Sequence, residues 1–311
     1  MALDLTGKSV AVLMGGPGSE RAVSLKSGEG VVDALRSLGA DAVPVVVDDE
    51  NFALPPGTAI AFNTIHGTFG EDGKLQRVLE SRGIYYTGEG VAGSELAIDK
   101  IASKRRFIER GVPTPAFEVI ASGARPTMPV PLVIKAPCEG SSVGVFIVRD
   151  PAKLDASLAG AAKFGVELLV EEFVEGRELT VGIVGGEALP VIEIRPKNAG
   201  EFYDFANKYS FLSPQAAGAD HFCPAPLSHE LTQRVQAVAL AAHRALDLEV
   251  YSRVDVLLTA DGAPLVIEIN TIPGMTPVSL LPEAAKAAGI SYPELCRRIL
   301  DLSLARSAPR P

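Results

Sequence analysis

A hairpin signal in the C-terminal third constrains this chain more than any other stretch. Two apolar-rich segments, residues 253–258 and 264–270, are typical of strands, and Asp261-Gly262 lies between them. An Asp-Gly pair favours a two-residue type I′ turn, because both central positions of that turn need a positive φ. The stretch therefore predicts a β-hairpin with one defined register.

That register brings four polar side chains to one face of the hairpin. Asp255 lies opposite Glu268, and Arg253 lies opposite Asn270, because side chains on a strand alternate between faces. One alternative is a solvated polar face on an edge hairpin. However, two opposed carboxylates in apolar strands repel one another unless a cation lies between them. Carboxylate and amide oxygens of this kind suit Mg²⁺ shared with substrate phosphates.

The residues after the hairpin predict a site for an anion. Residues 271–276 form a tight turn, in which Gly274 allows the backbone to approach a ligand closely. Ser279 and Leu280 then lead into a helix, and the free N–H groups at a helix N-terminus favour an anion.

Length and charge limit the classes of protein to which this chain can belong. It has 311 residues, which at ~100–200 residues per domain predicts two or three domains. Its formal net charge of −9 argues against a nucleic-acid partner, which would need a basic face. The absence of an apolar run of ~18 residues argues against a membrane span.

Cysteine usage and the first residues predict a cytoplasmic protein. Cys138, Cys223 and Cys296 are odd in number and far apart, which favours a reducing compartment over a disulfide framework. Asp4 and the lack of a long apolar run near the start argue against a signal peptide.

The N-terminal third has the pattern of a parallel α/β domain. A strand at 8–14 is followed by the glycine-rich segment 15–20 and a helix from about 21 to 38. Neither the dinucleotide fingerprint nor the Walker A pattern is present. Glu20 could also be an ordinary helix-end residue, because an acidic side chain in the first turn of a helix is electrostatically favourable.

Further strands at 43–47, 58–64 and 84–87 continue this domain. The loop at 66–73 precedes a helix, and its His66 has a purely structural role as the alternative to a place in the site. The small residues at 88–94 predict a domain boundary.

The middle of the chain predicts a phosphate-binding turn. After a helix over 95–110, strands at 132–135 and 145–148 flank the glycine- and serine-rich loop 137–144. Backbone N–H groups in such a turn can bind an anion, and Lys135 adds a positive charge beside it. Glycine-rich hairpins are common, so this signal alone leaves the function open.

The second half of the chain predicts more strands and a long functional loop. Strands are expected at 168–174, 179–184 and 188–195, with helices at 228–246 and 291–304. Residues 197–222 form a long loop that carries six aromatic residues, too many for a segment that stays in water. We therefore expect this loop to close as a lid over a bound ligand.

With these pieces in place, the chain resembles the D-alanine–D-alanine ligases of the ATP-grasp superfamily. The motifs that carry the resemblance are Gly-Glu-Asp-Gly at 70–73, Glu-Gly-Ser-Ser-Val-Gly at 139–144, Lys208-Tyr209, Arg253-Val254-Asp255 and Glu-Ile-Asn-Thr-Ile-Pro-Gly-Met-Thr at 268–276. The resemblance implies an α/β (α+β) chain with an N-terminal parallel domain and two antiparallel-sheet domains that clamp ATP. The expected boundaries are 1–94, 95–180 and 181–311.

The resemblance also implies which residues bind the nucleotide. Lys100 and Lys135 resemble the lysines that contact phosphates. Glu171 and Val174 resemble the hinge that reads adenine, and Glu178 resembles the ribose contact. The full set implied for the nucleotide is Lys100, Lys135, Ser141, Ser142, Glu171, Val174, Glu178 and Lys208.

The amino-acid and metal sites follow from the same resemblance. Glu20 resembles the residue that holds the ammonium of the first D-alanine, and Arg253 with the Gly274 N–H resembles an oxyanion site. The implied catalytic residues are Glu20, Ser141, Tyr209, Arg253 and Gly274. The implied substrate contacts are Glu20, His66, Ser279 and Leu280, and Glu71 matches a position near the substrate. The implied ligands of two Mg²⁺, with Mn²⁺ as a substitute, are Asp255, Glu268 and Asn270.

The implied reaction is the ATP-dependent joining of two D-alanine molecules through an acylphosphate, for peptidoglycan precursor synthesis. ATP and D-alanine are the expected partners of a cytoplasmic homodimer. Another ATP-grasp carboxylate–amine ligase is one alternative, against which Glu20, Tyr209 and Ser279 together argue. A D-alanine–D-lactate ligase is an example, against which Tyr209 argues. A non-catalytic nucleotide-binding regulator is another, although no metal ligand is missing. A nicotinamide dehydrogenase is excluded because it needs the absent glycine fingerprint.

Overall fold

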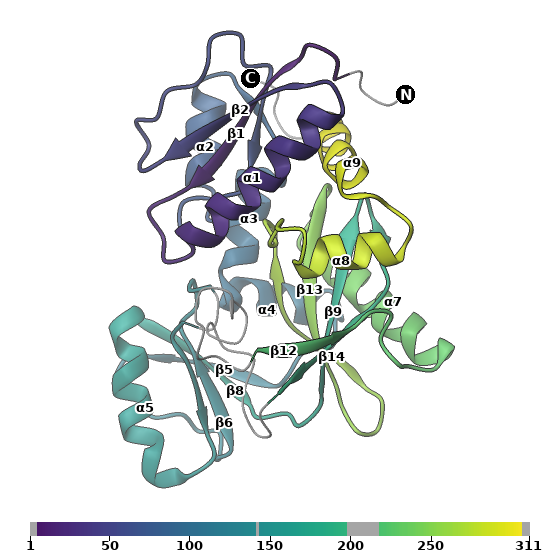
Figure 1. Cartoon of the computed structure of the whole chain (residues 1–311). Coiled ribbons are helices and arrows are strands. Elements are labelled where there is room, and N and C mark those ends of the chain that lie inside the picture. Colours follow the sequence, from purple (N-terminus) through teal and green to yellow (C-terminus); the bar gives the residue numbers. More distant parts are fainter. Residues whose placement is uncertain (1–4, 141–142, 198–217, 307–311) are drawn as a thin grey trace.

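The computed structural model describes residues 5–140, 143–197 and 218–306. These residues form three β-sheets with helices packed on them (Figure 1). The N-terminal sheet is parallel, and the other two sheets are antiparallel. This confirms the mixed α/β class that the sequence predicts.

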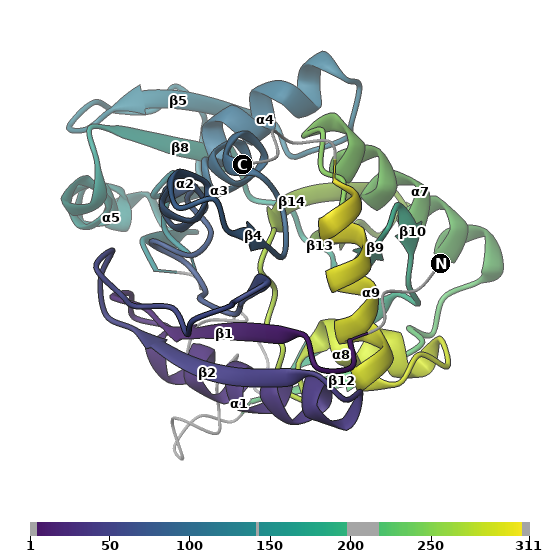
Figure 2. The same ribbon diagram turned by 90° about the horizontal axis from the view of Figure 1, so that it is seen from above.

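The parallel sheet has the strand order β2-β1-β3-β4. Its central strand β1 is buried from its second residue onward, as expected for an apolar strand that is covered on both faces. Figures 1 and 2 show α1 on one face of the sheet and α2 on the other. The strands and the helix after the glycine-rich segment lie where they were predicted. The elements are β1 (Ser9–Gly15), α1 (Arg21–Ser37), β2 (Asp41–Val47), β3 (Ile60–Asn63), α2 (Lys74–Ser81) and β4 (Tyr85–Tyr86).

The single helix predicted over 95–110 is wrong, because two helices meet at Asp99. α3 (Val91–Ile98) ends there, and α4 (Lys100–Glu109) begins one residue later. The Asp99 carboxylate accepts hydrogen bonds from the backbone N–H groups of Ile101 and Ala102, at 2.9 and 3.1 Å. Asp99 is thus an N-cap that starts a new helix, and Lys100 becomes its first residue.

The central sheet has the strand order β5-β8-β6-β7 and is antiparallel throughout. Helix α5 packs against β6 and β7. The sequence predicts β6, β7 and β8 but not β5 or α5, because α5 is short and buries only two of its residues. The elements are β5 (Phe117–Ala121), β6 (Leu132–Lys135), β7 (Val145–Val148), α5 (Leu154–Ala161) and β8 (Glu167–Glu172).

The C-terminal sheet has the strand order β12-β11-β9-β13-β14, and β10 pairs with β9. Helix α7 packs on β9, β13 and β14, and α8 packs on β9. The elements are β9 (Arg177–Val184), β10 (Glu187–Ala188), β11 (Ile192–Pro196), β12 (Ala219–Phe222), α7 (His229–Ala245), β13 (Tyr251–Leu258), β14 (Pro264–Asn270), α8 (Leu280–Ala287) and α9 (Tyr292–Ala305).

Two predictions about this sheet are wrong in part. The strand expected over 188–195 is interrupted between β10 and β11, where Pro190 has no N–H to donate to a ladder. The end of the expected loop over 197–222 is the strand β12, which pairs with β11. Residues 198–217 lie outside the described part of the chain.

The hairpin of β13 and β14 has the predicted register where its polar residues lie. Asp255 pairs with Glu268, and Arg253 pairs with Asn270. The four polar side chains therefore share one face of the C-terminal sheet, as predicted.

The turn of this hairpin differs from the prediction. The Gly262 N–H donates to the Thr259 carbonyl, and only Gly262 has a positive φ in the loop, so Asp261-Gly262 is not a type I′ turn. A three-residue loop of this kind shifts the register by one residue. A β-bulge between Asp255 and Val256 shifts it back. The predicted pairing is correct because the two offsets cancel.

One hydrophobic core joins the N-terminal and C-terminal parts of the molecule. It contains Val10 and Val12 of β1, Val184 of β9, Tyr251 of β13 and Leu295 of α9. Figure 2 shows α9 extending from α8, and α9 packs on α1, α8 and β4. This shared core fixes the parallel sheet relative to the C-terminal sheet.

The division into 1–94, 95–180 and 181–311 remains a proposal, and its second boundary falls inside β9. Among the helices that the structure describes, none combines the length and the apolar character that a bilayer span needs.

Candidate active site

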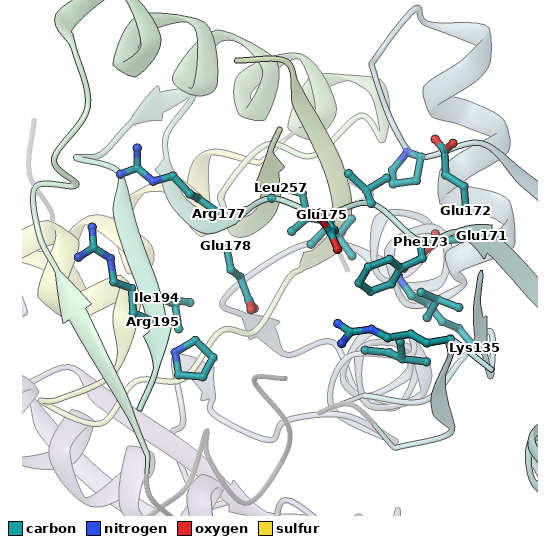
Figure 3. Close-up of a pocket in the computed structure, with 18 of the residues that line it drawn as sticks. Lys135, Glu171, Glu172, Phe173, Glu175, Arg177, Glu178, Ile194, Arg195 and Leu257 are labelled. Atoms are coloured by element: carbon teal, nitrogen blue, oxygen red, sulfur yellow. Dashed lines mark ion pairs between the residues drawn. The ribbon is translucent and has the colours of Figure 1, made fainter. Parts of the chain in front are cut away.

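The larger cavity lies between the two antiparallel sheets, where the chain passes from β8 to β9. Its volume is about 440 Å³. Lys135, Glu171, Val174 and Glu178, which the sequence assigns to the nucleotide, all line it. Figure 3 shows Lys135, Glu171 and Phe173 toward one end, Arg177 and Arg195 toward the other, and Glu178 between them.

The walls of this cavity suit a flat aromatic group. Apolar side chains from five strands and the 173–176 connection line the space, and charged side chains line it beside them. Arg149 also stacks over the Phe173 ring, and its guanidinium carbon lies 4.7 Å from the ring centroid. The apolar lining residues are Val133, Ile147, Phe173, Val174, Ile194, Leu257 and Ile267.

A buried trio of charges lies at the inner end of the cavity. Glu171 is 2% exposed, and its two carboxylate oxygens lie 2.5 Å from Lys104 Nζ and 2.5 Å from Lys135 Nζ. The Lys104 contact is an ion pair that lacks the alignment of a hydrogen bond. Burial alone would raise the pKa of Glu171, but Lys135 and Lys104 outweigh it and hold that pKa below its usual range. Glu171 is therefore a carboxylate near neutral pH.

The outer end of the cavity carries a second ionic cluster. Arg177 donates two hydrogen bonds of 2.8 Å to the Glu193 carboxylate, and Arg195 donates a third at 2.7 Å. The Arg177 hydrogen bonds are the main reason that the pKa of Glu193 is lowered to about 2. The cluster fixes β9 against β11 at the mouth of the cavity.

A smaller and more polar cavity lies where the parallel sheet meets the C-terminal sheet. Its volume is about 50 Å³. The parallel-sheet domain supplies carboxylates and an imidazole. Residues of α3 and α4, Gly140, β13, β14 and the loop after β14 supply the rest. The predicted site residues that line it are Glu20, His66, Lys100, Arg253, Glu268, Asn270 and Gly274, and Glu71 lines it as well.

Glu20 lies against two glycines in this cavity. A Cβ added at Gly67 would lie 2.7 Å from Glu20 Oε2, and one added at Gly140 would lie 3.2 Å away. The Glu20 side chain does not cap helix α1. Glu20 stands at the N-cap position of α1, so the helix-end alternative remains, and its side chain also lines the smaller cavity.

His66 connects the parallel-sheet domain to the loop after β14. Its Nδ1 lies 2.8 Å from the Ile272 carbonyl, and its Nε2 lies 3.1 Å from Ser27 Oγ. Since a carbonyl only accepts, Nδ1 carries the proton and Nε2 accepts from Ser27. Ser27 Oγ also accepts from the Met275 N–H at 3.3 Å. Burial lowers the pKa of His66, so the imidazole is neutral near pH 7.

Glu71 holds the same loop from the other side of Ile272. Its carboxylate accepts from the Ile272 N–H at 2.8 Å and from the Gly67 N–H at 2.7 Å. Burial is the main reason that the pKa of Glu71 is raised to about 8, and the nearby Glu20 adds to the effect. Together, His66 and Glu71 engage both backbone groups of Ile272 and so fix the residues on either side of it.

The three predicted metal ligands lie together on the hairpin. Arg253 donates to both oxygens of Asp255 at 2.9 and 2.7 Å, and Asn270 Nδ2 lies 3.5 Å from Asp255 Oδ2. Glu268 lies 3.6 Å from Lys100 Nζ. The described residues contain no group of three or more His, Cys, Asp or Glu side chains arranged to hold a metal ion by themselves. Two carboxylates and an amide oxygen nevertheless fit a hard divalent cation that takes its other ligands from phosphate and water.

The loop that contains Gly274 leads into α8. A Cβ at Gly274 would lie 2.8 Å from Ser279 Oγ, so a side chain there would displace the Ser279 hydroxyl. Ser279 Oγ accepts from the Thr276 N–H at 3.1 Å, and Leu280 is the first residue of α8. The structure thus brings Gly274, Ser279 and Leu280 to one corner beside the smaller cavity.

Some site residues lie outside the described residues, and others were not predicted. Ser141, Ser142, Lys208 and Tyr209 are outside the described ranges. The sequence analysis assigned no role to Lys104, Ser27 or Thr180, whose Oγ1 donates to Asp255 at 2.6 Å. For Lys104, the sequence gives no signal, because Arg105 and Arg106 follow it and only the tertiary structure shows which of these cations is buried.

Two antiparallel sheets around a nucleotide-sized cavity, with a polar cavity beside them, define this chain as a member of the ATP-grasp class. Residues 111–301 match the family model described as D-ala D-ala ligase C-terminus. A D-alanine–D-alanine ligase of Methylacidiphilum infernorum is 45% identical over 299 residues, which cover 96% of both chains. That of Geobacter sulfurreducens is 45% identical over 306 residues, covering 96% of this chain and 94% of the relative.

Solved structures agree with these sequence relatives. The D-alanine–D-alanine ligase of Bacillus anthracis superposes with a TM-score of 0.83 at 35% identity, covering 96% of this chain and 98% of that one. The Bacillus anthracis ligase complexed with ATP gives a TM-score of 0.80 at 32% identity and the same coverage. The chain belongs to the D-alanine–D-alanine ligase family.

Proposed function

We propose that this protein joins two D-alanine molecules into D-alanyl-D-alanine, a peptidoglycan precursor, with ATP as the energy source. The observation that carries the proposal is the adjacency of two unlike cavities. One has the size and apolar walls for a nucleotide base, and the other places Glu20, Arg253 and Gly274 around a small polar space. The names of the relatives and the ATP complex of the Bacillus anthracis ligase support the substrates.

In the first step, the carboxylate of the first D-alanine attacks the γ-phosphorus of ATP, and ADP leaves. A carboxylate is a poor electrophile at pH 7, so this acylphosphate supplies the leaving group for the second step. Glu20 holds the ammonium of the amino acid, and Lys100 and Lys135 offset the charge of the phosphates. Positioning and charge neutralisation are the main contributions of a protein to phosphoryl transfer.

In the second step, the amine of the second D-alanine attacks the acylphosphate carbonyl. The C–N bond forms, the amine loses a proton, and inorganic phosphate leaves. Arg253 and the Gly274 N–H stabilise the tetrahedral oxyanion, and one such donor is typically worth ~3–4 kcal/mol. Ser279 and the first N–H groups of α8 bind the second carboxylate.

Asp255, Glu268 and Asn270 would hold two Mg²⁺, which when bound neutralise the phosphate charge. Glu268→Gln removes one charge from this set and should lower kcat by roughly 100-fold or more, in the range seen when one electrostatic group is lost. Glu167→Gln, at an exposed position in β8, is the matched control. An unchanged kcat for Glu268→Gln at ordinary Mg²⁺ would rule out Glu268 as a ligand.

ADP release with D-alanine, L-alanine and D-lactate, compared side by side, tests the reaction. We expect release that depends on D-alanine, with D-alanyl-D-alanine detected by mass spectrometry. Absence of the dipeptide in the presence of ATP and Mg²⁺ would overturn the proposal. A mixed ester product with D-lactate would instead identify the D-alanine–D-lactate activity.

We place the reaction in the cytoplasm, because Cys138, Cys223 and Cys296 are all free thiols. A homodimer is also part of the proposal. Sedimentation velocity at micromolar concentrations would test it, and a monomer across that range would contradict it.

A further inference from the structure

Lys104 is a fully buried lysine directly behind the wall of the larger cavity. It is 1% exposed and is not among the residues that line the cavity. Its ammonium lies 2.8 Å from Thr114 Oγ1, 3.1 Å from the Pro115 carbonyl and 2.5 Å from Glu171 Oε1. An isolated buried ammonium would be strongly unfavourable, so this position is retained only with such a set of partners.

These contacts tie three segments of the molecule together. Lys104 comes from α4, Thr114 and Pro115 come from the turn before β5, and Glu171 comes from β8. Thr114 Oγ1 in turn donates to the Val266 carbonyl of β14 at 2.7 Å. Lys104 is thus placed to fix Glu171 relative to both antiparallel sheets that enclose the cavity.

Glu171 has two cationic neighbours with different positions. Lys135 lines the cavity, whereas Lys104 approaches the carboxylate from behind. If Lys104 were absent, Glu171 would have Lys135 as its only buried cation. The Lys135 ammonium would then be held more tightly by Glu171 and would be less available to a phosphate.

We infer that Lys104 is a positioning residue that keeps Glu171 ionised and fixed, so that Glu171 selects a 6-amino purine and Lys135 stays available to phosphates. This inference rests on the proposed function, in which Glu171 faces the adenine. An ionised carboxylate can only accept hydrogen bonds, so it favours the 6-amino group of adenine and repels the 6-oxo group of guanine. A protonated or displaced Glu171 would lose that distinction.

Nucleotide binding without D-alanine tests the inference separately from ligation. Calorimetry would compare the non-hydrolysable analogues AMP-PNP and GMP-PNP, with Mg²⁺, on wild type, Lys104→Met and Lys104→Arg. Lys153→Met, at an exposed position, is the matched control. Lys104→Met should weaken AMP-PNP binding roughly tenfold, the scale of one lost hydrogen bond to a charged group, and should shrink the AMP-PNP to GMP-PNP preference. Lys104→Arg should restore most of that preference, because the charge is kept.

The outcomes separate this inference from the proposed function. If wild type binds AMP-PNP but forms no dipeptide, the proposed reaction fails, and the selectivity comparison still decides the role of Lys104. If Lys104→Met keeps the wild-type affinity and preference, the positioning role is wrong. If Lys104→Met does not fold, the test uses Lys104→Arg and Thr114→Val instead. Thr114→Val removes one hydrogen-bond partner of Lys104 and leaves the charge of Lys104 unchanged. Unchanged preference in Thr114→Val and a preference lost in Lys104→Arg would also overturn the inference.

Discussion

The two cavities each have a buried glutamate in their lining, and the pKa values of the two residues are shifted in opposite directions. Glu171, in the larger cavity, lies between two lysines, which hold its pKa below the usual range. Glu71, in the smaller cavity, accepts two backbone N–H groups and lies near Glu20, and its pKa is raised to about 8. Burial raises the pKa in both cases, so the nearest charges decide the outcome.

The difference matches the task that we propose for each cavity. A permanently ionised Glu171 is a constant acceptor for a nucleotide base. Glu71 carries no full charge below pH 8, so Glu20 remains the carboxylate that meets the ammonium of an amino acid. The comparison predicts different consequences when each glutamate is neutralised.

The largest expected effect is on stability when Glu171 is neutralised. Glu171→Gln leaves Lys104 and Lys135 buried without their anion, which should lower the free energy of unfolding by about 3–5 kcal/mol. Glu71→Gln leaves one backbone N–H poorly paired and should cost only about 1–3 kcal/mol. Urea unfolding at pH 6 measures both. Equal losses would show that the two carboxylates have the same charge in the folded protein.

The next effect concerns pH and the nucleotide. Burial is the main cause that lowers the pKa of Lys104 to about 8, against the opposing effect of Glu171 and with further lowering by Lys135. Glu172 raises this pKa slightly. Lys104 is therefore charged below pH 8 and loses its charge as the pH rises through that value.

We expect the AMP-PNP dissociation constant to rise severalfold between pH 7 and pH 9, approaching the value of Lys104→Met. Lys104→Arg should remove this dependence, because arginine stays charged up to pH ~12. Calorimetry across that range is the measurement. A wild-type profile that Lys104→Arg leaves unchanged would assign the dependence to another group.

The sequence was sufficient to place the polar face of the hairpin because its residues follow a local pattern. Asp255, Glu268, Arg253 and Asn270 alternate along two strands joined by a turn, so their common face follows from strand geometry alone. The error in the turn type did no harm, since the β-bulge restored the pairing. Such compensation cannot be read from the sequence, because a bulge depends on how neighbouring strands pack.

The roles of Lys104 and Glu71 could not be predicted for a related reason. Their partners are distant in sequence: Lys104 reaches Glu171, and Glu71 reaches Ile272. The break at Asp99 was missed although Asp is a favoured N-cap, because the apolar pattern continues across it. Contacts between sheets depend on the tertiary arrangement, whereas contacts within a hairpin do not.

A third prediction concerns pH and stability at Glu71. Its folded pKa of about 8 lies above the ordinary value of 4.5, so only the folded state holds this proton between those two values. The stabilisation is complete below pH ~4.5 and is lost as the pH rises through about 8. Glu71→Gln cannot titrate. The thermal midpoint of wild type minus that of Glu71→Gln should therefore fall from pH 5 to pH 8, and a constant difference would contradict the raised pKa.

The smallest expected effect concerns Ser27, which strengthens the smaller cavity without entering it. Its hydroxyl donates to His66 Nε2 and accepts from the Met275 N–H, so Ser27→Ala loosens the loop that carries Gly274. The change should be small, because Tyr292 still donates to the Met275 carbonyl at 2.5 Å and Glu71 still accepts from Ile272. Ser27→Ala loses two neutral hydrogen bonds, each worth ~0.5–1.5 kcal/mol, and the remaining contacts offset part of this loss, so the KM for D-alanine should rise about threefold to tenfold.

The KM for ATP should stay at the wild-type value in Ser27→Ala, because no described contact of Ser27 reaches the larger cavity. Ser37→Ala, whose hydroxyl only donates within α1, is the matched control and should change neither constant. Steady-state kinetics with each substrate varied in turn separates the two cavities. An equal rise in both KM values would mean that the loop after β14 couples the two cavities. Glu71 and Glu171 would then belong to one continuous site.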